Sequence, residues 1–140
     1  MTETLIPAPD TAVWPAQAQG RVVTPGEGTA LVVPSGQGVT LQEVIFDMPS
    51  PDAAIYRFRY LAPAIARTGG TMDFEASIGD MQHLCDTYAR QNMAAPLPAS
   101  VQVIISFADM PVPFGETNPE VTQFFVAFTF EDGLCILEPY

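Results

Sequence analysis

The chain has 140 residues, 48% of them hydrophobic and 10% aromatic, and this composition predicts one globular domain with a single core. Sixteen Asp and Glu residues stand against five Arg and no Lys, and the formal net charge of −11 disfavours nucleic-acid partners, because these require clustered cations. No stretch approaches the roughly 18 to 20 apolar residues that cross a bilayer, so we also expect no membrane insertion.

The N-terminal part of the chain differs in character from the rest. Residues 1–28 contain closely spaced Pro and Gly and show neither helical nor strand periodicity. We predict an extended arm here, followed by one domain over residues 29–140. Four apolar side chains of the arm are candidates for contact with the domain itself or with a partner protein, namely Leu5, Ile6, Val13 and Trp14.

After a short apolar run at residues 30–33, a β-hairpin is predicted. Residues 39–48 and 54–61 have strand character, and turn-forming residues join them. A register that pairs Glu43 with Arg59 places the apolar side chains on one face, which belongs in the core, and the charged ones on the other. The apolar face comprises Val44, Phe46, Met48, Tyr56, Phe58 and Tyr60, and the charged face comprises Glu43, Asp47, Arg57 and Arg59.

One main helix is predicted next. It follows a Gly-Gly breaker, with a cap at Thr71 and an end near Asn92. Asp73 and Glu75 fall in its first turn, where acidic side chains are favourable. Apolar residues recur at helical spacing and predict one side that packs on a sheet. This stripe consists of Phe74, Ile78, Met81, Cys85 and Tyr88.

The C-terminal third predicts three further strands, at residues 101–107, 121–131 and 134–138. Asp132-Gly133 indicates a two-residue hairpin turn between the last two. This turn places Cys135 opposite Phe130, on the inward, aromatic face. The predicted fold is therefore α+β, a two-layer antiparallel sheet with one main helix packed across it.

The two cysteines are predicted on surfaces that face each other. Cys85 lies on the apolar stripe of the helix and Cys135 on the inward face of the sheet, so one helix-on-sheet contact brings them within disulfide range. Such a bond would stabilise the fold by roughly 4 kcal/mol. The alternative is that both are buried free thiols. A redox-active role is disfavoured because the chain has no C-x-x-C pair.

Arg57 and Arg59 are the nearest approach to an anion site, since they place two cations on one strand face. Two interpretations are open. The arginines form structural ion pairs with the acidic residues of the neighbouring strand, or they bind a carboxylate ligand with Tyr56 or Tyr60 at the edge of the site.

No catalytic or metal-binding set is apparent in the sequence. His83 is the only histidine; it lies two positions before Cys85, so on a helix it points away from the thiol, and we expect it to face solvent. One histidine and two paired cysteines do not supply a zinc site. The acidic loop at residues 108–120 lacks the pattern of a calcium-binding loop, and no serine occupies a nucleophile motif. We therefore expect no metal and no cofactor, and we do not expect an enzyme.

Several stretches carry a family resemblance, namely residues 57–66 (RFRYLAPAIA), 69–75 (GGTMDFE), 113–116 (PFGE), 122–125 (TQFF) and 135–140 (CILEPY). Over residues 30–140 the chain resembles a family of short alphaproteobacterial proteins of unknown function. The resemblance implies export and a cysteine at both of the positions of Cys85 and Cys135, hence a periplasmic disulfide-bonded domain. It brings no established activity and no catalytic residues.

The leading functional hypothesis is a non-enzymatic interaction protein, an accessory subunit of a larger assembly with a protein partner. A small-ligand binding module that uses the two arginines is the second, and a thiol-based or hydrolytic enzyme is the third. The acidic surface serves either solubility or attraction of a basic partner. The start of the chain has no basic and apolar export signal. We therefore expect a periplasmic or secreted protein if the disulfide forms, and a cytoplasmic one otherwise.

Overall fold

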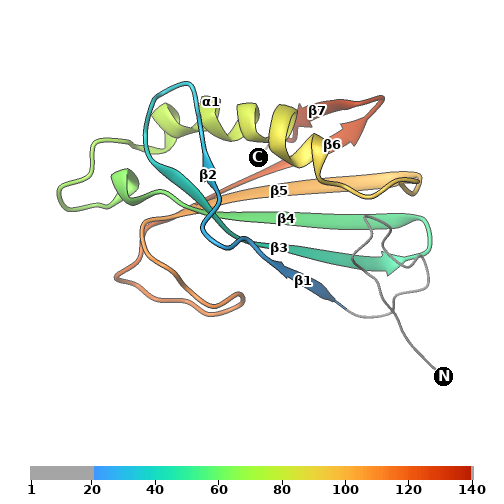
Figure 1. Cartoon of the computed structure of the whole chain (residues 1–140), viewed down its shortest axis with the longest axis horizontal. Helices are drawn as coiled ribbons and strands as arrows, with labels where there is room; N and C mark the ends of the chain where they lie inside the picture. The colour runs from blue at the N-terminus through green and yellow to red at the C-terminus, as the bar shows by residue number, and fades with distance from the viewer. Residues whose placement is uncertain (1–20, 140) are drawn as a thin grey trace.

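The computed structural model describes residues 21–139, which form a seven-stranded mixed sheet with a helix across one face (Figure 1). The α+β class is confirmed. The strands are β1 (Val22–Pro25), β2 (Ala30–Leu31), β3 (Val39–Ser50), β4 (Ala53–Leu61), β5 (Ser100–Ala108), β6 (Gln123–Glu131) and β7 (Leu134–Leu137). The helical segments are η1 (Pro63–Ile65), α1 (Phe74–Leu84) and a π-helical turn η2 (Cys85–Ala89) that continues α1.

The strand order is β1-β3-β4-β5-β6-β7, and β2 pairs with β3 beside β1. All neighbours are antiparallel except β4 and β5, which run parallel. The prediction of a wholly antiparallel sheet is therefore wrong. The chain between β4 and β5 crosses over through α1, and a crossover of this kind returns the chain to the end at which the first strand began. Side-chain alternation sets the two faces of a strand but does not set its direction.

The predicted register of the β3–β4 hairpin is confirmed. Glu43 lies opposite Arg59, and Ile45 lies opposite Arg57. The apolar set that the sequence predicts therefore lies on the face that α1 covers, and the charged set lies on the other face. Ile45 and Ile55 also lie on the charged face, since they are opposite Arg57 and Asp47.

The core lies between the sheet and the helix. Its largest fully buried side chains include Tyr56, Phe58 and Phe107 from the sheet and Met81 and Leu84 from α1. The predicted apolar stripe of the helix packs against this core along its whole length. Burial of these side chains supplies the main driving force of folding.

The helix begins two residues later than predicted. Asp73, not Thr71, is the N-cap, and its side chain accepts a hydrogen bond from the Ala76 amide at 2.8 Å. The amide of Thr71 donates instead to the Ala64 carbonyl at 2.8 Å, so Thr71 belongs to the preceding loop. The π-helical turn ends at Ala89, and Arg90 and Gln91 continue the helix, which therefore ends close to the predicted Asn92.

The β6–β7 hairpin follows the prediction. Asp132 and Gly133 both have positive φ angles, 53° and 77°, as a two-residue turn that matches the strand twist requires. Phe130 lies opposite Cys135 as predicted.

A buried carboxylate joins the loop before β3 to the helix. Asp80 is 1% exposed, and its oxygens accept hydrogen bonds from the Ser35 amide at 3.0 Å, the Ser35 hydroxyl at 2.5 Å and the Gln37 side-chain amide at 2.8 Å. A buried carboxylate is tolerated when it is hydrogen-bonded in this way.

The predicted arm needs a correction at its C-terminal end. Residues 22–25 are not part of an irregular arm, because they form β1, which pairs with residues 43–46 of β3. The four candidate contact residues of the arm, Leu5, Ile6, Val13 and Trp14, lie outside the described residues.

Within residues 21–139, no helix is both long enough and apolar enough to cross a membrane.

Candidate functional site: the open face of the sheet

The sheet has a second face that no helix or strand of residues 21–139 covers. We call it the open face. Its side chains come from alternate positions of each strand, so its composition follows from the register. On β3 and β4 it carries charged side chains together with Ile45 and Ile55, and on β5, β6 and β7 it carries both apolar and uncharged or acidic polar side chains. Its principal members are Glu43, Asp47, Arg57, Arg59, Ile104, Ser106, Phe125, Ala127 and Ile136.

The charged part of the open face consists of paired side chains. Arg57 bonds to Asp47, and Arg59 bonds to Glu43. Arg21, at the start of β1, also donates from Nε to Asp47 at 3.0 Å. Burial acts to raise the pKa of Asp47, but the hydrogen bonds and charges of Arg21 and Arg57 lower it more, so that its pKa lies below the usual value.

The loop between β5 and β6 folds over this charged part. The Val112 carbonyl accepts a hydrogen bond from Arg59 Nη2 at 2.8 Å and another from the Gln42 side chain at 3.4 Å. The ring of Phe114 then lies among three guanidinium groups. Its centroid is 4.7 Å from Cζ of Arg21, 5.2 Å from that of Arg57 and 5.5 Å from that of Arg59. Each such cation–π contact contributes about 0.5–1 kcal/mol at an exposed site.

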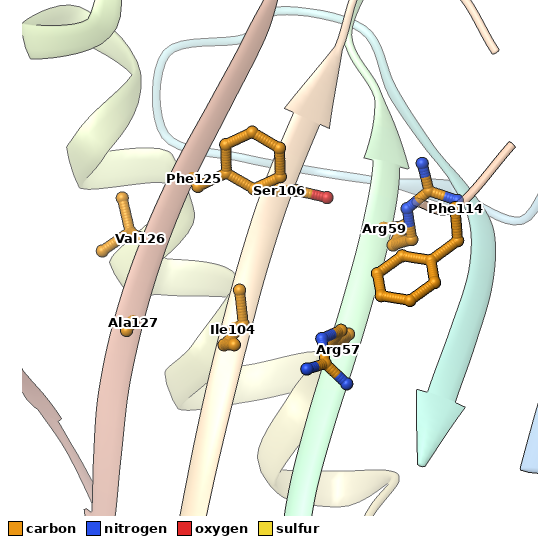
Figure 2. A pocket seen from close by; sticks show the side chains of 8 residues that line it. All are labelled: Arg57, Arg59, Ile104, Ser106, Phe114, Phe125, Val126 and Ala127. Carbon is orange, nitrogen blue, oxygen red and sulfur yellow. The ribbon is translucent and has the colours of Figure 1, made fainter. Parts of the chain in front are cut away.

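A cavity of about 390 Å³ lies on the open face between Phe114 and Phe125 (Figure 2). Ile104 and Ser106 project from β5 between the two rings, and Arg57 and Arg59 line the side toward β4. A second hollow of about 1010 Å³ adjoins it under the β5–β6 loop and shares Arg59, Phe114 and Phe125 with it. We call the two hollows together the groove.

Large apolar side chains beside the groove are exposed. Phe125 is 55% exposed, and Ile136 on β7 is 45% exposed. The two lie on the same face, because Ile136 is opposite Thr129, which shares its side of β6 with Phe125. Leu134, opposite Glu131, is a further exposed apolar residue near the hairpin turn. Glu138 lies on the same face and accepts hydrogen bonds from Gln102 and Thr129, so polar side chains separate Phe125 from Ile136 and Leu134.

The predicted grouping of the arginines with Tyr56 or Tyr60 is not what the structure shows. Both tyrosine rings lie in the core on the helix-covered face, so neither lines the groove. Tyr56 uses its hydroxyl to accept a hydrogen bond from the Ala94 amide at 3.2 Å, and burial raises its pKa to about 12. Burial also raises the pKa of Tyr60.

Sequence reasoning missed the two aromatic walls of the groove. Phe125 had a usable signal, because it is out of phase with Phe124 and Val126 and so must point to the opposite face. Phe114 had none, since its position depends on contacts between the β5–β6 loop and arginines distant in the sequence.

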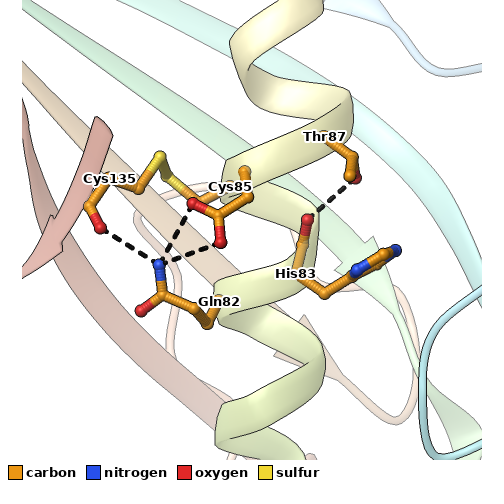
Figure 3. Close-up of a disulfide and its surroundings, with 6 residues drawn as sticks. Gln82, His83, Cys85, Thr87 and Cys135 are labelled. Carbon is orange, nitrogen blue, oxygen red and sulfur yellow. Dashed lines mark hydrogen bonds between the residues drawn. A yellow bond between two sulfur atoms is a disulfide. The ribbon is translucent and has the colours of Figure 1, made fainter. Parts of the chain in front are cut away.

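On the covered face, Cys85 and Cys135 form the predicted disulfide (Figure 3), with their Cα atoms 6.1 Å apart. Gln82 reinforces this junction by donating to the Cys135 carbonyl at 3.1 Å. The side chain of His83 points to the side of the helix away from Cys135. Both cysteines are therefore used in the bond, and the alternative of two buried free thiols is wrong for this structure.

The comparisons with known proteins point to a family but to no activity. Within residues 21–139, no three His, Cys, Asp or Glu side chains gather as metal ligands would. No curated protein and no solved structure is detectably similar to the chain. The sequence profile of DUF6497, a family of unknown function, matches residues 11–140. The match confirms the resemblance to a family of unknown function and extends it toward the N-terminus. The chain therefore belongs to DUF6497.

Proposed function

We propose that this protein is a non-enzymatic interaction protein whose open face binds an apolar segment of a partner protein in the groove between Phe114 and Phe125. The observation that carries the proposal is the 55% exposure of Phe125 beside a preformed, mainly apolar cavity. Aromatic and arginine side chains that surround a pocket are the residues that dominate binding energy in protein interfaces.

The ion pairs of the groove favour an uncharged partner segment. Arg57 and Arg59 already have carboxylate partners, so a ligand need not bring negative charge to meet them. Their guanidinium planes are held in place beside Phe114, and a preorganised surface loses little side-chain entropy on binding. The groove therefore offers stacking and apolar contact to a segment without charge.

Small-ligand binding is the second candidate. The cavity volume falls within the range of roughly 300–1,000 Å³ that is usual for small-molecule sites. A carboxylate ligand, however, would have to displace Asp47 or Glu43 from its arginine. The pairing therefore supports the partner-protein hypothesis over anion recognition.

We further propose that the protein acts in an oxidising compartment, the periplasm or the cell exterior. The support is the disulfide between Cys85 and Cys135, since such bonds persist where thiols are not kept reduced. Intact-mass analysis of the natively isolated protein, with and without reduction before alkylation, tests this. A mass unchanged by alkylation unless the protein is first reduced is expected, and two alkylatable thiols in the native protein would contradict it.

The interaction itself is tested by affinity. A partner recovered from the source cells by mild cross-linking is purified, and its binding is measured with the wild-type chain, with Phe125→Ser and with Val32→Ser. Val32 is 89% exposed in the loop after β2, outside the groove, and serves as the matched control. We expect Phe125→Ser to weaken binding by at least roughly tenfold, the effect of an interface hot spot, and Val32→Ser to leave it unchanged. Equal binding by all three proteins would contradict the proposal.

A further inference from the structure

We propose that the partner segment in the groove is a carboxyl terminus, with its terminal carboxylate bound by Arg67 and its apolar last side chain between Phe114 and Phe125. This inference rests on the proposed function for the position of the site, and it names the chemical class of the ligand. Arg57 and Arg59 keep their own carboxylates and take no part in binding the chain end.

The first support is the distribution of positive charge. Four of the five arginines border the groove, although the net charge of the chain is −11. Three of them, Arg21, Arg57 and Arg59, bond to acidic side chains of β3. Arg67 lines the larger hollow and has no carboxylate within ion-pair distance among residues 21–139. Its charge is therefore available to an anionic ligand.

The second support is the set of hydrogen-bond donors in the larger hollow. Nη2 of Arg67 donates to the Pro119 carbonyl, which leaves further N–H groups of the guanidinium for a ligand. The side-chain oxygen of Asn118 accepts a hydrogen bond from the Glu120 amide at 3.0 Å, so its side-chain nitrogen remains as a donor. Gln123 lines the same hollow with a second side-chain amide. A guanidinium flanked by amides is suited to the two oxygens of a carboxylate.

The third support is that the β5–β6 loop bounds the larger hollow. The loop is fastened to the rest of the domain at Val112, whose carbonyl accepts a hydrogen bond from Arg59 at 2.8 Å, and at Pro119 through Arg67. Residues 114–119, between these two points, line the hollow. A chain that runs from the cavity into the hollow meets this loop, so the space suits a chain end better than a continuous segment.

One acidic side chain of the larger hollow opposes a carboxylate ligand. Glu116 lines the hollow, but it is exposed and bonds through its side chain to no other residue of the described part of the chain, so it can turn toward solvent. Charges farther away than roughly 8–10 Å are screened at physiological salt, so the arginines next to the hollow matter more than the net charge of the chain.

Peptide binding to the full chain tests this inference. The probes are acetyl-Ala-Ala-Ala-Phe with a free terminal carboxylate, the same peptide as its amide, and acetyl-Ala-Ala-Asp-Phe amide, whose carboxylate is in a side chain. Dissociation constants are measured by nuclear magnetic resonance titration of the isotope-labelled protein. We expect the free acid to bind roughly three- to fivefold more tightly than either amide, the effect of one exposed ion pair.

Two arginine variants show whether Arg67 causes the preference for the acid. Arg67→Gln should bind the acid no more tightly than the amides and should bind the amides as the wild-type protein does. Arg90→Gln, at the end of the helix and outside the groove, should keep the preference. If Arg67 only held the loop in place, its loss would change the affinities for all three peptides together.

Four results would overturn the inference. They are equal binding of the acid and its amide, equal binding of the acid and the aspartate peptide, a preference that survives Arg67→Gln, and no detectable binding of the acid. Failure here is separable from failure of the proposed function. Equal binding of all three peptides that Phe125→Ser weakens refutes only this inference, whereas peptides that bind Phe125→Ser and the wild-type protein equally well would count against the groove itself. If no peptide binds, the affinity for the purified partner still tests the proposed function.

Discussion

On one side of β6, Phe124, Val126 and Phe128 pack into the core beneath the helix, and the disulfide fastens the neighbouring strand β7 to that helix. On the other side of the same strand, Phe125 and Ala127 line the groove. Phe125 and Phe128, three positions apart on β6, therefore have different roles: Phe128 packs in the core and Phe125 lines the groove. The covered face holds the main core of the fold, whereas Phe125 is 55% exposed and remains available for binding.

The largest expected effect separates these two faces on β6. Phe128→Ala removes a fully buried ring and should lower the free energy of unfolding by roughly 3–5 kcal/mol. Phe125→Ala removes a ring that is more than half exposed and should cost less than about 1 kcal/mol. Urea unfolding of both variants measures the difference. Similar losses of unfolding free energy at the two positions would contradict this contrast, because they would mean that Phe125 is buried in the free protein.

The disulfide is the next largest contribution of the covered face. It joins residues 50 positions apart, and removing it with the pair Cys85→Ala and Cys135→Ala should cost about 4 kcal/mol, because the unfolded chain regains the entropy of an open loop. Thermal unfolding of the double variant measures the loss, and reduction of the wild-type protein should reproduce most of it. A melting temperature insensitive to both treatments would contradict this role.

Two tyrosines of the covered face should respond differently to the loss of their hydroxyls. Tyr56→Phe leaves the buried Ala94 amide without its acceptor and should cost about 1–2 kcal/mol. The Tyr60 hydroxyl finds no partner among the described residues, so Tyr60→Phe should be neutral or slightly stabilising. Chemical unfolding of the two variants side by side tests the contrast, and a larger loss at Tyr60 would refute it.

The smallest expected effect lies on the open face and depends on pH. The pKa of Asp47 is lower in the folded protein than in the unfolded chain, so its ion pairs stabilise the fold above the unfolded value of about 4. That stabilisation is lost as the pH falls through the folded pKa. Asp47→Asn should therefore flatten the acid limb of the stability profile, whereas Asp52→Asn, at an exposed turn, should leave it unchanged. A wild-type acid limb in Asp47→Asn would exclude this contribution.

Local patterns were sufficient to predict the faces of the strands and the pairings within hairpins. The alternation of charged and apolar residues predicted Glu43 opposite Arg59, and Asp132-Gly133 predicted Cys135 opposite Phe130. The helical spacing of Cys85 and the inward position of Cys135 were enough to predict that the two can form a disulfide.

Long-range features could not be predicted in the same way. The parallel pairing of β4 with β5 depends on how the crossover through α1 returns to the sheet, which no local pattern encodes. The place of Phe114 depends on an arginine that reaches the Val112 carbonyl across 53 positions of sequence. The shape of the groove depends on both the parallel pairing of β4 with β5 and the position of Phe114. The sequence therefore predicted the arginines of the groove but not its shape.

Photo-cross-linking in the source cells shows whether the open face is the binding surface. A photo-reactive phenylalanine analogue is placed at position 125 of the full chain, with the same analogue at position 32 as the reference. We expect an adduct between position 125 and a specific partner protein, and none at position 32. Equal cross-linking from both positions, or no adduct at position 125, would contradict it.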